Sequence, residues 1–152
     1  MGVSDVWHPR PMPEMTADER RTFLSTGSRT GVLATVRRDG RPHAAPIWFL
    51  HDGDDVVFMT GGDTVKGRNL ARDPRATLVV DDAGFPFAFA VLEGTCELSD
   101  DLDELRRWST PIAARYVPAD QAEAYGARNA VPGELLVRMT VTKTITTTAV
   151  AD

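Results

Sequence analysis

Basic residues and glycines gather in the stretch GGDTVKGRNLARDP, residues 61–74, which separates two segments of strand-like composition. A strand end followed by glycines and a helix start leaves backbone amides free, and the positive end of the helix dipole favours a phosphate or carboxylate there. Thr60 and Thr64 can add hydroxyl donors, while Lys66 and Arg68 can add positive charge. The stretch therefore predicts an anion-binding site.

A solvated loop whose arginines pair with surface acids explains the same residues about as well. Lys66 and Arg68 are two positions apart, so on a regular helix they point to different sides. They share one anion only if it caps the first turn. Arg72 and Arg75 fit the solvated loop better than the anion site, and the spacing alone leaves both interpretations open.

The segment HAAPIWFL, residues 43–50, is a second candidate surface. Pro46 has no amide proton for a strand ladder, so it marks an edge, a bulge or a gap. Trp48 and Phe49 bring aromatic surface to opposite faces of the strand, and a flat ring could lie against this backbone. A barrel edge with ordinary core aromatics is at least as good an interpretation.

The sequence contains no good candidate for a catalytic side chain. His8, His43 and His51 lack metal-ligand spacing and suggest no Ser-His-Asp arrangement. Glu93 and Glu97 lie on one face of one strand and fit a solvated or dimer-contacting role. A bound cofactor would therefore have to supply the chemistry.

The composition fits a single soluble domain, because the chain has 152 residues, 42% of them hydrophobic and 26% charged. A net charge of −5 argues against a nucleic-acid partner. The sequence predicts no membrane span and no secretory signal. Cys96 is the only cysteine, which favours a reducing cytoplasm, and we interpret it as a small buried hydrophobe.

The order of elements predicts an antiparallel barrel. Residues 1–15 contain three prolines and predict an extended arm, followed by one domain over residues 16–152. A capping box, Thr16 to Glu19, begins a helix that ends near Gly27. Asp-Gly turns at 39–40 and 52–53 predict hairpins. A helix from Ser99 and a shorter one over 119–129 precede the last strand. The six predicted strands cover residues 31–36, 42–50, 56–60, 76–81, 87–98 and 134–148.

Three segments together resemble the pyridoxamine 5′-phosphate oxidase-like split barrels: GVLATVRRDGRPHAAPIWF, VVFMTGGDTVKGRNLARDPRATLVV and AVLEGTCELS. The resemblance covers roughly residues 16–145 and is greatest to the actinobacterial deazaflavin-dependent branch, which uses coenzyme F420. It implies a mainly β (α+β) fold, a six-stranded antiparallel split β-barrel of the FMN-binding type with a few flanking helices. It also implies a homodimer with two cofactor sites at the subunit interface.

The resemblance assigns a cofactor-binding role to ten residues. Thr60, Thr64 and Lys66 would hold the cofactor phosphate, with Arg68 and Asn69 nearby. The segment Pro46, Ile47 and Trp48 would face the ring, with Met59 at its edge and Phe85 covering the ring or the substrate.

Departures from the oxidase pattern favour F420 over FMN. Ala45 and Leu50 stand where true pyridoxamine phosphate oxidases have basic residues, and Val65-Lys66 replaces their Arg-Lys pair. Their C-terminal Trp and Arg signature is missing. We therefore expect an F420-dependent oxidoreductase that passes a hydride to a small unsaturated or quinone-like acceptor. The alternatives are an FMN-dependent enzyme on the same fold and a non-catalytic binder of a flat ligand.

Overall fold

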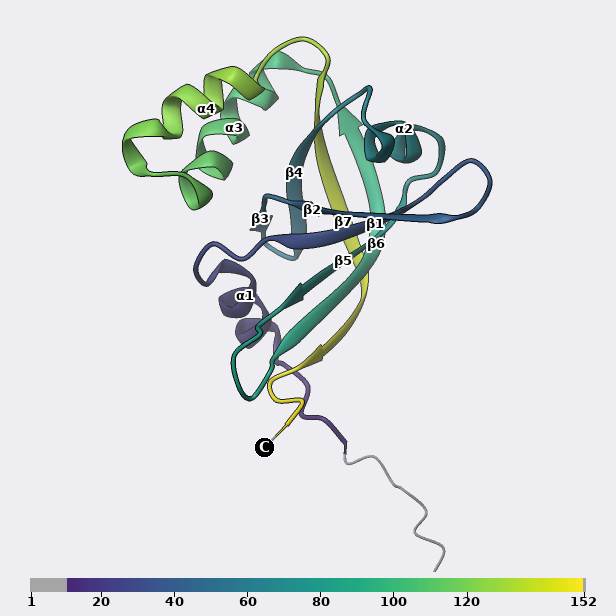
Figure 1. The fold of residues 1–152 in the computed structure, drawn as a ribbon, viewed down its shortest axis with the longest axis vertical. Helices are drawn as coiled ribbons and strands as arrows, with labels where there is room; N and C mark the ends of the chain where they lie inside the picture. Colours follow the sequence, from purple (N-terminus) through teal and green to yellow (C-terminus); the bar gives the residue numbers. More distant parts are fainter. Residues whose placement is uncertain (1–10, 152) are drawn as a thin grey trace, which may run out of the picture.

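One antiparallel sheet of seven strands, flanked by four α-helices, carries the fold in the computed structural model, which describes residues 11–151 (Figure 1). The elements in chain order are α1 (Ala17–Ser25), β1 (Gly31–Val36), β2 (Pro42–Ile47), β3 (Phe49–Asp52), β4 (Asp55–Gly61), α2 (Val65–Arg72), β5 (Arg75–Asp81), β6 (Phe89–Ser99), α3 (Leu102–Tyr116), the 3-10 helix η1 (Ala119–Gln121), α4 (Ala122–Asn129) and β7 (Glu134–Thr147).

The strand order is β2-β1-β5-β6-β7-β4-β3, so the two edge strands are consecutive in the chain. Trp48 is the only residue between them. The sheet therefore curls into a split half-barrel, and the chain crosses at Trp48 the seam where its two edges approach each other. The prediction of six strands is wrong for this reason: the expected strand 42–50 is divided, with β2 pairing to β1 and β3 pairing to β4.

Helix α3 explains why the strand divides at Trp48. The backbone amide of Phe49 donates to the Tyr116 hydroxyl at 3.1 Å, and the Phe49 carbonyl accepts from Arg115 at 2.8 Å. These bonds give both backbone groups of Phe49 a partner on α3 in place of a neighbouring strand, because buried backbone groups must be paired. Pro46 also offers no amide to β1.

Local signals place most of the other boundaries. The capping box of α1 forms as predicted, because Thr16 accepts from the Glu19 amide and the Glu19 carboxylate accepts from the Thr16 amide. Gly40 and Gly53 have φ values of 87° and 62°, as the Asp-Gly turns require. The predicted helix start at Ser99 is wrong. Ser99 is the last residue of β6, where it pairs with Leu136, and Asp101 caps α3 instead.

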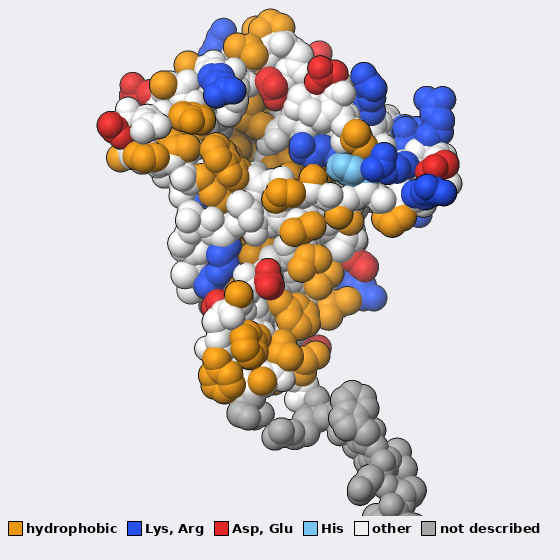
Figure 2. Space-filling model, viewed as in Figure 1, with side chains coloured by type: hydrophobic (Ala, Val, Ile, Leu, Met, Phe, Trp, Pro, Cys, Tyr) orange, Lys and Arg blue, Asp and Glu red, His pale blue; other side chains and the backbone are white. Residues whose placement is uncertain are grey.

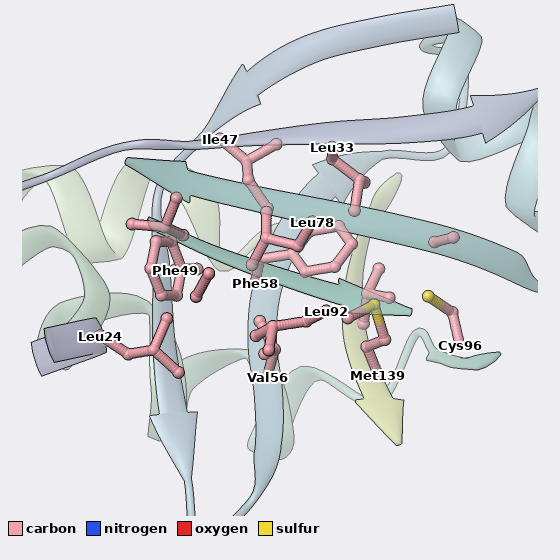
Figure 3. Close-up of a cluster of buried hydrophobic side chains, with 14 of the residues drawn as sticks. Leu24, Leu33, Ile47, Phe49, Val56, Phe58, Leu78, Leu92, Cys96 and Met139 are labelled. Atoms are coloured by element: carbon pink, nitrogen blue, oxygen red, sulfur yellow. The ribbon is translucent and has the colours of Figure 1, made fainter. Parts of the chain in front are cut away.

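The main core fills the concave side of the sheet. Figure 3 shows Leu33, Phe49, Phe58, Leu78 and Leu92 converging there from different strands. A smaller cluster around Val57, Leu105, Ile112 and Leu136 packs α3 against β4 and β7. Cys96 belongs to the main core, and burial raises the pKa of its thiol to about 12, which confirms its interpretation as a buried hydrophobe.

The predicted arm lies partly outside the described residues. Its described end lies against the C-terminal segment, because Met15 donates from its amide to Thr146 Oγ1 and Thr148 donates to the Pro13 carbonyl. Between residues 11 and 151, no helix has the length and apolar character needed to cross a membrane.

Candidate functional site

A cavity of about 260 Å³ opens between the sheet seam and three helices. The seam and β4 supply Pro46, Ile47, Trp48 and Met59 to its lining, and α2 supplies Lys66. Half of the ten predicted site residues therefore meet in one place, including both the proposed ring surface and the proposed phosphate-binding cation. Helices α3 and α4 add Ser109, Ile112 and Asn129, which complete the lining.

The aromatic wall of this cavity is held by helix packing. The Trp48 ring stacks on Tyr116 with centroids 5.1 Å apart and planes 5° apart, and Tyr125 of α4 lies 6.3 Å away at a tilt. Burial raises the pKa of Tyr116, whose hydroxyl donates to the carbonyl of Arg29 or of Phe49. Trp48 is consequently a fixed wall.

Thr60 and Thr64 lie beneath the start of α2, and their hydroxyl groups bind each other at 2.9 Å. Thr64 Oγ1 also donates to the Gly61 carbonyl at 2.7 Å and accepts from the Gly67 amide at 3.1 Å. With one proton per hydroxyl, both protons are used within the protein. A role for these two threonines as phosphate donors stays a prediction and requires these bonds to be exchanged. Gly67 is needed here, because a Cβ at this position would overlap the Gly61 carbonyl.

Arg68 and Lys66 point to different sides of α2, as their spacing predicted. Arg68 lines a separate open groove of about 810 Å³ between α2 and the β1–β2 turn. Arg37, Arg38 and Arg72 line the same groove, with Asp39 as its one acidic residue. Figure 2 shows Lys and Arg side chains gathered at this upper right side of the molecule. The groove is therefore a strongly positive surface next to the helix that carries Lys66.

The solvated-loop interpretation fits Arg75 but not Arg72. Arg75 pairs with Asp73 at 2.7 Å, and this bond holds the pKa of that carboxyl at about 2, as expected for a surface ion pair. Arg72 is exposed, but its guanidinium donates to the Val36 carbonyl at 2.7 Å and to Asn69 Oδ1 at 3.1 Å. The expectation that Arg72 pairs with a surface acid is therefore wrong.

Asn69 is only 4% exposed and joins α2 to β1, because its Nδ2 donates to Thr35 Oγ1 at 3.0 Å. We expect Asn69→Ala to lower the free energy of unfolding by about 1–3 kcal/mol, since it leaves buried partners unpaired. Urea unfolding measures this loss, and a cofactor titration of the folded variant should show a smaller effect than removal of Lys66. Unchanged stability combined with lost affinity would instead mean that Asn69 contacts the ligand.

Glu134 is a charged neighbour of Lys66 that the sequence did not single out. It begins β7 opposite Gly61 in the β4–β7 ladder. Burial and the nearby Asp63 carboxylate raise the pKa of Glu134, while the Lys66 ammonium opposes this change. The Glu134 carboxylate therefore competes with any bound anion for the positive charge of Lys66.

Phe85 lies far from this cavity within one chain. It is 72% exposed in the β5–β6 loop, beside Phe87, and the neighbouring Pro86 carbonyl accepts from the Val150 amide. Figure 1 shows this loop near the C-terminus, at the opposite end of the molecule from α2 and α4. A role for Phe85 over the cofactor stays a prediction and requires a second subunit to bring it there.

A sequence profile of the family described as pyridoxamine 5′-phosphate oxidase matches residues 16–147. This chain belongs to that family. Among solved structures of similar fold is Rv2991, a conserved hypothetical protein of Mycobacterium tuberculosis, with a TM-score of 0.79 and 26% identity over 93% of this chain and 89% of its own. A protein described as an F420 reductase superposes with a TM-score of 0.67 and 25% identity, over 82% of this chain and 94% of its own.

One curated relative is general stress protein 26 of Bacillus subtilis, 30% identical over 90 residues. The match covers 53% of this chain and 64% of that protein, so slightly less than two thirds of the relative is represented. Lys66 of the predicted phosphate segment and the predicted ring segment Pro46–Trp48 both line the cavity. The additional lining residues Ser109 and Asn129 come from the helical segment between β6 and β7. The sequence pattern of this segment predicted an apolar helix face but no site residue.

Proposed function

We propose that the protein is an F420-dependent oxidoreductase that transfers a hydride between reduced deazaflavin and a small unsaturated or quinone-like acceptor. The observation that carries the proposal is the meeting of an aromatic-walled cavity with Lys66, next to a groove lined by four arginines. Membership in a family of flavin-binding split barrels and similarity to an F420 reductase support it.

The residues present fit a cofactor with a flat ring and an anionic chain. Pro46, Ile47 and Trp48 would back the ring, and Lys66 would meet the phosphate. F420 continues beyond its phosphate into a chain of carboxylates, whereas FMN ends at one phosphate. The arginine groove offers more positive charge than a single phosphate needs, and this favours F420.

The contribution of the chain is orientation of the bound ring. When bound, reduced F420 supplies the hydride. The stacked Trp48 and Tyr116 rings and the Tyr116 bonds to the backbone fix the wall that sets the ring's position. Ile47, Ile112 and Met59 add apolar surface to the lining, beside the polar groups of Lys66, Ser109 and Asn129.

We expect Glu134→Gln to raise affinity for an anionic cofactor by about two- to fivefold at neutral pH, because it removes a negative charge near Lys66. The raised pKa of Glu134 gives the sign of the pH effect in the wild type. A bound anion favours the protonated carboxyl, so affinity should rise as pH falls through this pKa. Titrations between pH 4.5 and 8 measure both effects. A Glu134→Gln variant with the same pH profile as the wild type would contradict this role.

A two-fold homodimer would close the open side of the site. An apolar row crosses five neighbouring strands on the convex face, formed by Pro46, Val32, Val79, Val91 and Ile145 in direct register. Val32 and Ile145 are each 44% exposed, and Figure 2 shows hydrophobic side chains over the β1, β5 and β6 region. Pro46 also lines the cavity, so the row ends at the site. A second copy on this face would cover both.

Fluorescence titration of the purified protein with F420 and with FMN tests the function. The proposal predicts quenching of F420 at low concentration, little response to FMN, and faster oxidation of reduced F420 by a quinone such as menadione. Tight FMN binding with rapid oxygen consumption would establish the FMN-dependent alternative. Binding of F420 without acceleration for any acceptor would establish a non-catalytic binder.

A further inference from the structure

The cavity has one polar side that neither the phosphate nor the ring-backing residues explain. Ser109 and Asn129 lie in its lining together with Lys66, and the remaining lining residues are apolar. A cavity with apolar walls and a few convergent polar groups orients a ligand through those groups. Ser109 and Asn129 are therefore candidates for recognition of the ligand's polar edge.

Asn129 is placed by helix packing rather than by its own hydrogen bonds. It is the last residue of α4. Helix α4 can pack closely on α3 because Gly126 has no side chain, and a Cβ at this position would overlap Thr110. Within residues 11–151, the Asn129 amide forms no side-chain hydrogen bond. It is half-buried, so its donor and its acceptor are both available to a ligand in the cavity.

Ser109 is unusual for a buried helical serine. Ser25 and Thr26 at the end of α1 donate back to carbonyls of the preceding turn, at 2.9 Å and 2.6 Å. Ser109 is 3% exposed overall and makes no such bond to any residue of the described chain, but its hydroxyl is not a fully enclosed atom, because Ser109 borders open cavity space. It lines the ligand cavity and also a second cavity of about 300 Å³ between α3 and α4. The Ser109 hydroxyl is therefore available to bond a ligand atom in either cavity.

We propose that Asn129, assisted by Ser109, recognises the carbonyl–NH–carbonyl edge of a planar heterocycle held between Trp48 and Ile112. A carboxamide presents one N–H donor and one C=O acceptor side by side, which is the complement of an adjacent C=O and N–H on the ring. The Ser109 hydroxyl supplies one more bond at the same end of the cavity. This inference rests on the proposed function only in requiring that a flavin-type ring occupies the cavity.

Lumiflavin and 3-methyllumiflavin are the matched probes, because they share the ring, carry no phosphate and differ only in the N–H of that edge. We expect the wild type to bind lumiflavin about two- to tenfold more tightly than its methyl derivative, the range of one neutral hydrogen bond. Asn129→Ala should lower lumiflavin affinity by a similar factor and abolish the discrimination, as a coupled pair does in a double-mutant cycle. Ser109→Ala should lower the affinity for both probes.

Gln121→Ala is the matched control, since Gln121 is an exposed amide on η1 outside the cavity lining. A melting curve for each variant separates loss of binding from loss of fold. Discrimination that persists in folded Asn129→Ala, or no binding of lumiflavin by the wild type up to its solubility limit, would overturn the proposal. If the discrimination depends on Asn129 but F420 is neither bound nor oxidised, the edge recognition holds and the F420 function fails.

Discussion

Replacing Lys66 with alanine is expected to weaken F420 binding by roughly 10- to 150-fold. Lys66 lines the same cavity as Met59 and Asn129, and it forms no ion pair with a carboxylate of the described chain. A hydrogen bond to a charged group contributes on the order of 1.5–3 kcal/mol, and each factor of ten in affinity corresponds to about 1.4 kcal/mol. The melting temperature should change little, because Thr64 caps α2 through the Gly67 amide and not through Lys66.

The control for this variant is Arg107→Ala, which removes one cation from an exposed position on α3. Arg72 is unsuitable, because its bonds to Val36 and Asn69 tie α2 to β1 and it lines the basic groove. Fluorescence titration and a melting curve are measured for both variants. If Lys66→Ala binds F420 like the wild type, the phosphate lies elsewhere, and the arginine groove becomes the first place to look.

Local signals in the sequence predicted most of the sheet. The Asp39-Gly40 and Asp52-Gly53 turns need positive φ, and their glycines adopt it. The division of the strand at Trp48 was not predictable, because its cause is a pair of residues on α3, Arg115 and Tyr116, that are more than sixty positions away in the chain.

The candidate site shows the same limit. The ring segment around Pro46 and the cation Lys66 were predicted to meet, and they line one cavity. Asn129 reaches that cavity only because α4 packs on α3 through Gly126 and Thr110, a contact that no local pattern encodes. Thr60 and Thr64 were assigned by residue type as donors, but type alone could not reveal that they satisfy each other.

The convex apolar row gives the second large expected effect. Val91 is flanked on both sides within the row, paired with Val79 on one side and Ile145 on the other. In a two-fold dimer, Val91→Asp places one carboxylate from each copy in the interface, and each unpaired buried charge costs several kcal/mol. We expect the dimer dissociation constant to rise at least about a thousandfold, which is roughly 4 kcal/mol. The monomer itself should stay folded, because Val91 points away from the main core.

Light scattering at micromolar concentration should show a dimer for the wild type and a monomer for Val91→Asp. Ala124→Asp, which adds the same charge on an exposed position of α4, should remain dimeric. Cofactor affinity should fall together with dimerisation in Val91→Asp, although Val91 does not line the cavity, because Pro46 joins the row to the site. A wild type that is monomeric and binds F420 fully would contradict the dimer. A Val91→Asp monomer with full affinity would show that one chain completes the site by itself. Phe85 would then not contact the cofactor, because it lies far from the cavity of its own chain.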